Sequence, residues 1–246
     1  MADLNPDVRI FEDLDALSQA AADAFAVAST RSAGERGRFL VALSGGSTPI
    51  PLYRLLGAPP YVGQINWGTT QVFWGDERCV PVEDLENSYR QVHDILLGHV
   101  TVPPKNVHRV PSELEPEDAA AEYQRTLKEF ASPPLDWPRF DLVLLGMGSD
   151  GHTASLFPGS EVAPTAPALA VTGNYEDRPA RRVTLSPAVF NSARQVIFLV
   201  SGEGKAGVLK RVLYGKSEPE VLPAQRIRPL DGSLIWMVDR AAASQL

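Results

Sequence analysis

The sequence predicts an α/β fold in which helices cover both faces of a mostly parallel, Rossmann-like sheet. Short apolar runs recur along the chain, and segments with helical periodicity lie between many of them. Strands that alternate with helices in this way form a largely parallel sheet.

Seven apolar runs are expected strands, and helices are expected where apolar residues recur three or four positions apart. The run of residues 115–118, Glu-Pro-Glu-Asp, is typical of a helix N-terminus. The expected strands cover residues 8–11, 38–43, 71–74, 141–145, 182–185, 195–200 and 234–238. The expected helix faces carry Leu17, Ala21, Ala24 and Ala28, then Ala120, Tyr123, Leu127 and Phe130, and then Val208, Leu209, Val212 and Leu213.

Stretches rich in proline and glycine occur at residues 57–63, 102–105, 132–138 and 158–167. Each lasts only a few residues before a periodic segment resumes, so they are interpreted as surface loops. The sequence therefore predicts one domain over residues 1–246.

The chain has 246 residues and a formal net charge of −7. This charge argues against general nucleic-acid binding, although a local basic pocket could still bind a small anion. The sole cysteine, Cys79, excludes an internal disulfide and fits a reducing compartment. The first ten residues offer no apolar signal-peptide core, and no apolar run approaches the ~20 residues of a membrane span. We expect a cytoplasmic protein without a membrane partner; the sequence leaves the oligomeric state open, with a monomer as the expectation.

A glycine-rich turn follows the second expected strand. Its glycines allow a tight turn, and Pro49 suits the first turn of a helix that Ser47 or Thr48 could cap. Free backbone N–H groups and hydroxyls at a helix start can bind phosphate. The turn lacks the lysine and spacing of a P-loop, and a plain strand-turn-helix cap is the alternative. The candidate phosphate ligands here are Ser44, Gly45, Gly46, Ser47 and Thr48.

A charged triplet, Asp76-Glu77-Arg78, follows the third expected strand. Asp76 could face a substrate, and the Arg78 guanidinium could bind an anion or a developing oxyanion. A solvated turn is the alternative. Cys79 has no partner that would make it a nucleophile.

The fourth expected strand leads into a loop that carries Asp150 and His152, just before an expected helix. Residues 146–151 match G-x-G-x-x-G, but no acidic residue ends a second strand about 20 positions further on, so dinucleotide binding is not favoured. Asp150 could orient the His152 imidazole and keep it basic. A loop histidine with an ordinary hydrogen bond is the alternative.

Two further cations are candidate anion ligands. Lys205 lies at an expected helix N-terminus, where its charge opposes the helix dipole unless an anion binds, and Arg182 begins an expected strand. A solvent-facing lysine is the alternative for Lys205. The sequence has no motif with metal-ligand spacing, and we expect no metal.

Together these segments resemble the 6-phosphogluconolactonases. The matching pieces, in order, are residues 44–48, 76–78, 148–158, 182–185 and 202–206, and their spacing spans about residues 8–239. Several motifs in one order are more specific than any single motif.

The resemblance implies hydrolysis of 6-phospho-D-glucono-1,5-lactone without a metal or an organic cofactor, in a fold related to that of the glucosamine-6-phosphate deaminases. Those deaminases are similar at the glycine-rich loop, at Asp76 and around His152. They carry a glutamate for sugar-ring opening where this chain has Phe157, and this departure favours the lactonase.

On this resemblance, His152 is the expected base, Asp150 orients it, and Asp76 contacts sugar hydroxyls or positions water. Residues 44–48, Arg182 and Lys205 are expected to hold the phosphate. Arg78 could bind phosphate or stabilise the oxyanion. Two rivals remain open: an amino-sugar-phosphate deaminase or isomerase, and a non-catalytic sugar-phosphate-binding module, which usually needs an output domain.

Overall fold

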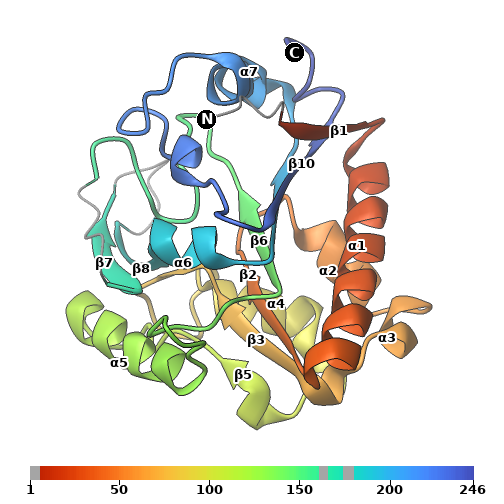
Figure 1. Ribbon diagram of the computed structural model, residues 1–246, viewed down its shortest axis with the longest axis vertical. Helices are drawn as coiled ribbons and strands as arrows, with labels where there is room; N and C mark the ends of the chain where they lie inside the picture. The colour runs from red at the N-terminus through yellow and green to blue at the C-terminus, as the bar shows by residue number, and fades with distance from the viewer. Residues whose placement is uncertain (1–5, 161–165, 174–179) are drawn as a thin grey trace.

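A computed structural model describes residues 6–160, 166–173 and 180–246 of the chain (Figure 1). Its strands are β1 (Asp7–Phe11), β2 (Phe39–Leu43), β3 (Thr70–Trp74), β4 (Asp76–Arg78), β5 (Val107–His108), β6 (Leu142–Gly146), β7 (Ala168–Thr172), β8 (Arg181–Leu185), β9 (Gln195–Val200) and β10 (Ser233–Asp239). Its α-helices are α1 (Leu14–Arg36), α2 (Ile50–Leu56), α3 (Tyr61–Gln64), α4 (Ser88–Ile95), α5 (Pro116–Glu129), α6 (Pro187–Ser192) and α7 (Ala206–Tyr214).

Within the described residues, the main sheet has seven strands in the order β1-β10-β9-β6-β2-β3-β5, and every neighbouring pair is parallel. The predicted Rossmann-like α/β fold is therefore confirmed. None of the described helices is long and apolar enough to cross a membrane.

The central strands are buried on both faces, which explains their unbroken apolar runs. All five residues of β2 are buried, and they alternate between two cores. Leu40 and Ala42 belong to the core that contains apolar residues of α5, α6 and α7. Phe39, Val41 and Leu43 belong to the core that contains residues of α1, α2 and α4. Helices thus cover both faces of the sheet, as the sequence predicts.

Local chemistry sets the ends of the longest helix, α1. The side chain of Asp13 accepts a hydrogen bond of 2.8 Å from the backbone N–H of Ala16 and so satisfies a free donor of the first turn. The helix ends at Gly37, whose φ of 70° is a left-handed conformation that glycine adopts without strain.

A second sheet corrects the sequence-based picture. Residues 182–185 form a strand as predicted, but β8 pairs antiparallel with β4 and β7 outside the main sheet. The sequence did not predict β4 or β7. The charged β4 is too short to show an apolar alternation, and it is a strand because it pairs with β8.

The helix expected directly after His152 is absent from residues 153–160, which form consecutive turns. Ala154 has a φ of 48°, and a bridge joins Thr153 to Leu156. Ser155 donates a hydrogen bond to the carboxylate of Asp76. These contacts fix a non-helical path. Residues 161–165 lie outside the described residues.

The carboxyl ends of β2 and β6 lie at the point where the strand order of the main sheet changes direction. From β2 the chain continues to β3 and β5 on one side, and from β6 it continues to β9 and β10 on the other. The order therefore reverses between β2 and β6. In open α/β sheets, ligands bind at the carboxyl ends of the strands at such a switch point.

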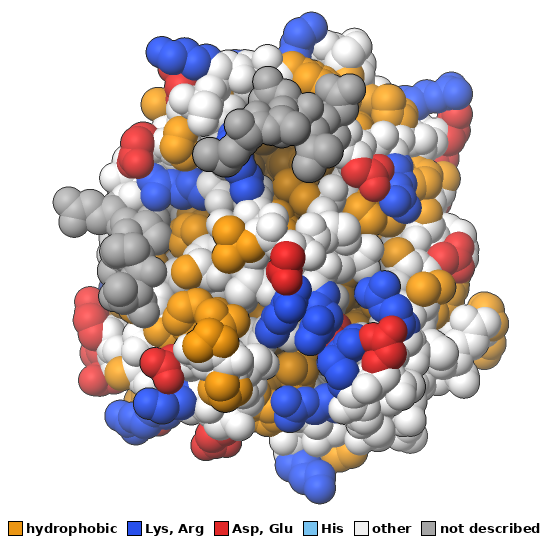
Figure 2. All heavy atoms as spheres, in the orientation of Figure 1, with side chains coloured by type: hydrophobic (Ala, Val, Ile, Leu, Met, Phe, Trp, Pro, Cys, Tyr) orange, Lys and Arg blue, Asp and Glu red, His pale blue; other side chains and the backbone are white. Residues whose placement is uncertain are grey.

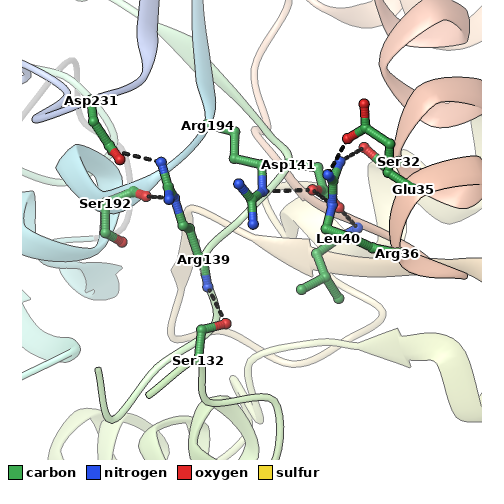
Figure 3. A network of polar contacts seen from close by, with 10 residues as sticks. All are labelled: Ser32, Glu35, Arg36, Leu40, Ser132, Arg139, Asp141, Ser192, Arg194 and Asp231. Atoms are coloured by element: carbon green, nitrogen blue, oxygen red, sulfur yellow. Dashed lines mark hydrogen bonds and ion pairs between the residues drawn. The ribbon is translucent and has the colours of Figure 1, made fainter. Parts of the chain in front are cut away.

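The amino ends of these strands are held by a buried carboxylate, that of Asp141 (Figure 3). It accepts hydrogen bonds from the backbone N–H of Leu40, at 2.8 Å, and from Nε of Arg36, at 3.0 Å. Arg194 Nε lies 3.3 Å from the same carboxylate. Nearby, Arg139 pairs with the exposed Asp231. Basic and acidic side chains gather on this face of the molecule (Figure 2).

We predict that Asp141→Asn destabilises the fold by about 3 kcal/mol, the lower end of the range for breaking a buried ion pair, because it removes the buried negative charge that faces Arg36 and Arg194. Asp231→Asn is the matched control. Its side chain is 66% exposed, and it should change the free energy of unfolding by less than ~1 kcal/mol. Urea unfolding of the three proteins measures the difference, and equal stability of both variants would contradict the prediction.

Candidate active site

A cavity of about 280 Å³ opens at the carboxyl ends of β2, β3 and β6. All but one of the residues predicted for the site line this cavity, although they come from five separate segments. The exception is Asp150, which contacts Nδ1 of His152. The residues that line it are Ser44, Gly45, Gly46, Ser47, Thr48, Pro49, Asp76, Arg78, Ser88, Gly146, Met147, Gly148, His152, Ala154, Arg182 and Lys205.

Two backbone N–H groups of the glycine-rich turn after β2 donate hydrogen bonds to side chains of the protein. The N–H of Ser44 donates to the hydroxyl of Tyr53 at 3.1 Å, and that hydroxyl donates back to the Ser44 carbonyl at 2.6 Å. The N–H of Gly46 donates to Oε1 of Gln91 at 2.9 Å. These two N–H groups are thus engaged within the protein, a detail that the sequence did not predict.

The structure corrects the expectation that Ser47 or Thr48 caps the next helix. The helix α2 begins at Ile50 after Pro49, and no side chain caps its N-terminus. Ser47 and Thr48 line the cavity instead. Pro49 holds a helical conformation with φ of −81°, so the helix starts without a capping side chain.

Positive side chains form another part of the cavity wall. Arg78 and Arg182 are directly opposite each other in the β4–β8 pairing, and both are largely buried. Arg78 donates to the Glu86 carbonyl at 2.8 Å. Lys205 is the residue that precedes the first turn of α7. Like charges at paired strand positions, and a cation at a helix N-terminus, are unfavourable on their own, and a bound anion would offset both.

His152 and Asp150 form a close pair. Nδ1 of His152 lies 2.6 Å from Oδ1 of Asp150, which also accepts the His152 backbone N–H at 3.0 Å. Burial alone would raise the pKa of the Asp150 carboxyl, but the hydrogen bonds and charge of His152 hold that pKa below its ordinary value. The ionised carboxylate thereby fixes the ring and leaves Nε2 as the nitrogen directed away from it.

Close packing fixes the imidazole from two further sides. A side chain at Gly148 would place its Cβ 2.2 Å from the ring of His152, so only glycine fits there. The ring of Phe157 packs against that of His152, tilted by 38° with centroids 4.9 Å apart. The Arg182 guanidinium lies over the same Phe157 ring, 5.4 Å from its centroid. Phe157 therefore contacts both the base candidate and a cation of the cavity wall.

Asp76 lines the cavity, as the sequence predicts, and one hydrogen bond orients its carboxylate. Oδ2 of Asp76 accepts from the Ser155 hydroxyl at 2.6 Å. Sequence reasoning did not single out Ser155, whose role depends on a contact between residues 79 positions apart.

Glu77 and Cys79 follow Asp76 in the sequence, and neither lines the cavity. The wholly buried Glu77 accepts hydrogen bonds from the backbone N–H groups of Ser88 and Tyr89, at 2.7 and 2.8 Å. Sequence reasoning assigned no role to Glu77, because its partners lie 11 and 12 positions further along the chain. Burial raises the pKa of the Cys79 thiol to about 11, which agrees with its exclusion as a nucleophile.

In the part of the chain that the structure describes, no three His, Cys, Asp or Glu side chains cluster as metal ligands. Fold and cavity together define an α/β protein with cationic side chains on the cavity wall and a carboxylate-histidine pair.

Comparison with known proteins gives the family. A family model described as glucosamine-6-phosphate isomerases/6-phosphogluconolactonase matches residues 12–236. A 6-phosphogluconolactonase of Synechocystis sp. is 38% identical over 219 residues, 88% of each chain. The structure of 6-phosphogluconolactonase from Trypanosoma brucei matches with a TM-score of 0.87 at 28% identity and covers 98% of both chains. A monomeric glucosamine-6-phosphate deaminase shares the fold, with a TM-score of 0.83 at 21% identity over 98% of this chain and 100% of its own. The chain belongs to the family of glucosamine-6-phosphate isomerases and 6-phosphogluconolactonases.

We predict that Gly148→Ala displaces the His152 ring and destabilises the fold by about 1–3 kcal/mol, the usual cost of overpacking. The NMR signal of the Nδ1 proton between His152 and Asp150 should shift or disappear. Gly63→Ala is the matched control, because no atom lies within 4 Å of its added Cβ. An unchanged signal and unchanged stability in Gly148→Ala would contradict the packing argument.

Proposed function

We propose that the protein hydrolyses 6-phospho-D-glucono-1,5-lactone to 6-phospho-D-gluconate, with His152 as the general base. The chain is a lactone hydrolase of the 6-phosphogluconolactonase class, as are its curated relatives. The observation that carries the mechanism is the 2.6 Å contact between His152 and Asp150 in a cavity with cations along another wall.

The reaction needs a base for the attacking water, donors for the oxyanion and an anchor for the 6-phosphate. In our proposal, Nε2 of His152 takes a proton from water as the oxygen of that water bonds to the C1 carbonyl carbon. The carbonyl oxygen becomes an oxyanion, and the C1–O5 bond then breaks. The oxyanion collapses as that bond breaks, and the ring oxygen takes the proton from Nε2 of His152, which restores the base. The new carboxyl group at C1 then releases its own proton to solvent and becomes a carboxylate. Asp150 stabilises the imidazolium that forms in the first step.

The cations have the other two tasks. The 6-phosphate binds to residues 44–48, Arg182 and Lys205, and this remote anchor orients C1 for attack. Arg78 binds the phosphate or the oxyanion. Asp76 contacts sugar hydroxyls or positions water, because Ser155 holds its carboxylate at the cavity wall.

The contact between Phe157 and His152 supports lactone hydrolysis over the deaminase reaction. The deaminases that the sequence resembles carry a glutamate at this position for ring opening. Here an apolar ring packs against the imidazole instead. We also propose a cytoplasmic location and a single domain, as the sequence indicates.

His152→Ala should lower kcat by at least ~10² with little change in KM, because a general base acts in the transition state. The substrate is generated in situ, and its disappearance is followed above the spontaneous rate. His93→Ala is the control, since His93 is exposed on α4. Near-normal turnover by a folded His152→Ala protein would remove His152 from the mechanism.

Lys205→Ala should raise KM by about 10-fold or more and change kcat less, because it removes a charge-assisted contact to the phosphate. Lys210→Ala replaces an exposed lysine on the helix that follows Lys205, and it should leave both constants unchanged. If KM stays at the wild-type value in Lys205→Ala, the phosphate is held elsewhere.

A further inference from the structure

The first turns of α4 pack against the glycine-rich loop and support it. A Cβ at Gly45 would lie 2.4 Å from the hydroxyl oxygen of Ser88, so the loop backbone lies directly against this helix. One turn further on, Oε1 of Gln91 accepts the N–H of Gly46 at 2.9 Å. Gly46 has a φ of 93°, a conformation that other residues rarely adopt. The shape of the loop thus depends on two contacts with α4.

The position of α4 is itself fixed by Glu77. Its carboxylate accepts the N–H groups of Ser88 and Tyr89, while Asn87 caps the helix through the N–H of Arg90 at 2.9 Å. Glu77 also accepts the N–H of Arg78 at 2.8 Å. Because Glu77 lies between two residues that line the cavity, the strand that carries them and the helix that supports the loop form one connected unit.

We propose that Gln91 is a positioning residue for the phosphate of the substrate. It is not among the described residues that line the cavity, so it acts through Gly46 rather than by touching the ligand. Its hydrogen bond holds the Gly45–Gly46 turn so that Ser47 and Thr48 face the cavity. This inference rests on the proposed function, because it assumes that this loop binds the phosphate.

A side-chain amide suits this position on electrostatic grounds. The N–H of Gly46 needs an acceptor, because its neighbours leave it partly buried. A carboxylate would also accept this hydrogen bond, but its negative charge would oppose an incoming phosphate. The uncharged Gln91 satisfies the backbone without repelling the ligand.

Gln91→Met tests the proposal, since methionine keeps the length of the side chain and removes the acceptor. KM for the lactone should rise about 3- to 10-fold, the change expected for the loss of one neutral hydrogen bond. The value of kcat should stay within about twofold, because His152 is unaffected. The Kd of 6-phosphogluconate, measured by calorimetry without turnover, should rise by the same factor as KM.

Gln64→Met is the matched control, because Gln64 is exposed on α3, and it should leave KM, kcat and Kd unchanged. Gln91→Met with a wild-type KM and Kd would overturn the proposal. A fall in kcat and melting temperature at constant Kd would also overturn it, because that pattern marks a merely structural role. If the wild type binds 6-phosphogluconate but does not hydrolyse the lactone, the proposed function fails, while the Kd values still test Gln91.

Discussion

The parallel pairing of β2 with β6 organises both the core of the protein and its cavity. Val41 pairs with Leu142 and Ala42 with Val143, and both strands are buried between the two helical layers. Because the strand order reverses here, the loops that follow these strands diverge and leave room for a cavity. Asp141 holds the opposite ends of the same two strands through the N–H of Leu40. A buried polar contact at one end thus supports an open site at the other.

Electrostatics explains why an acidic protein can hold an anionic ligand. The chain carries a net charge of −7, yet Arg78, Arg182 and Lys205 come from separate segments to one cavity. The antiparallel pairing of β4 with β8 places the two arginines opposite each other. Burial strengthens the field of these cations, because less water screens them. The local arrangement of charge, and not the total, sets the ligand class.

Tight backbone packing gives the site its rigidity. Gly148 leaves just enough room for the His152 ring, and Gly45 leaves room for Ser88. Because neither glycine has a side chain, the His152 ring and the Ser88 hydroxyl pack directly against the backbone. The pair of His152 and Asp150 is local, whereas the support of the loop by α4 joins residues 45 positions apart.

Apolar periodicity and motif chemistry are properties of neighbouring residues, so they were enough to predict the α/β class, the buried strands and most of the residues at the cavity. It missed β4 and β7, and it placed a helix after His152 where Ser155 instead bonds to Asp76. Two features became visible only in the folded molecule: the Gly46 N–H donates to Gln91, and Arg78 lies opposite Arg182. Those contacts join segments far apart in the chain, and their geometry is set by strand pairing and helix packing, which no local pattern records.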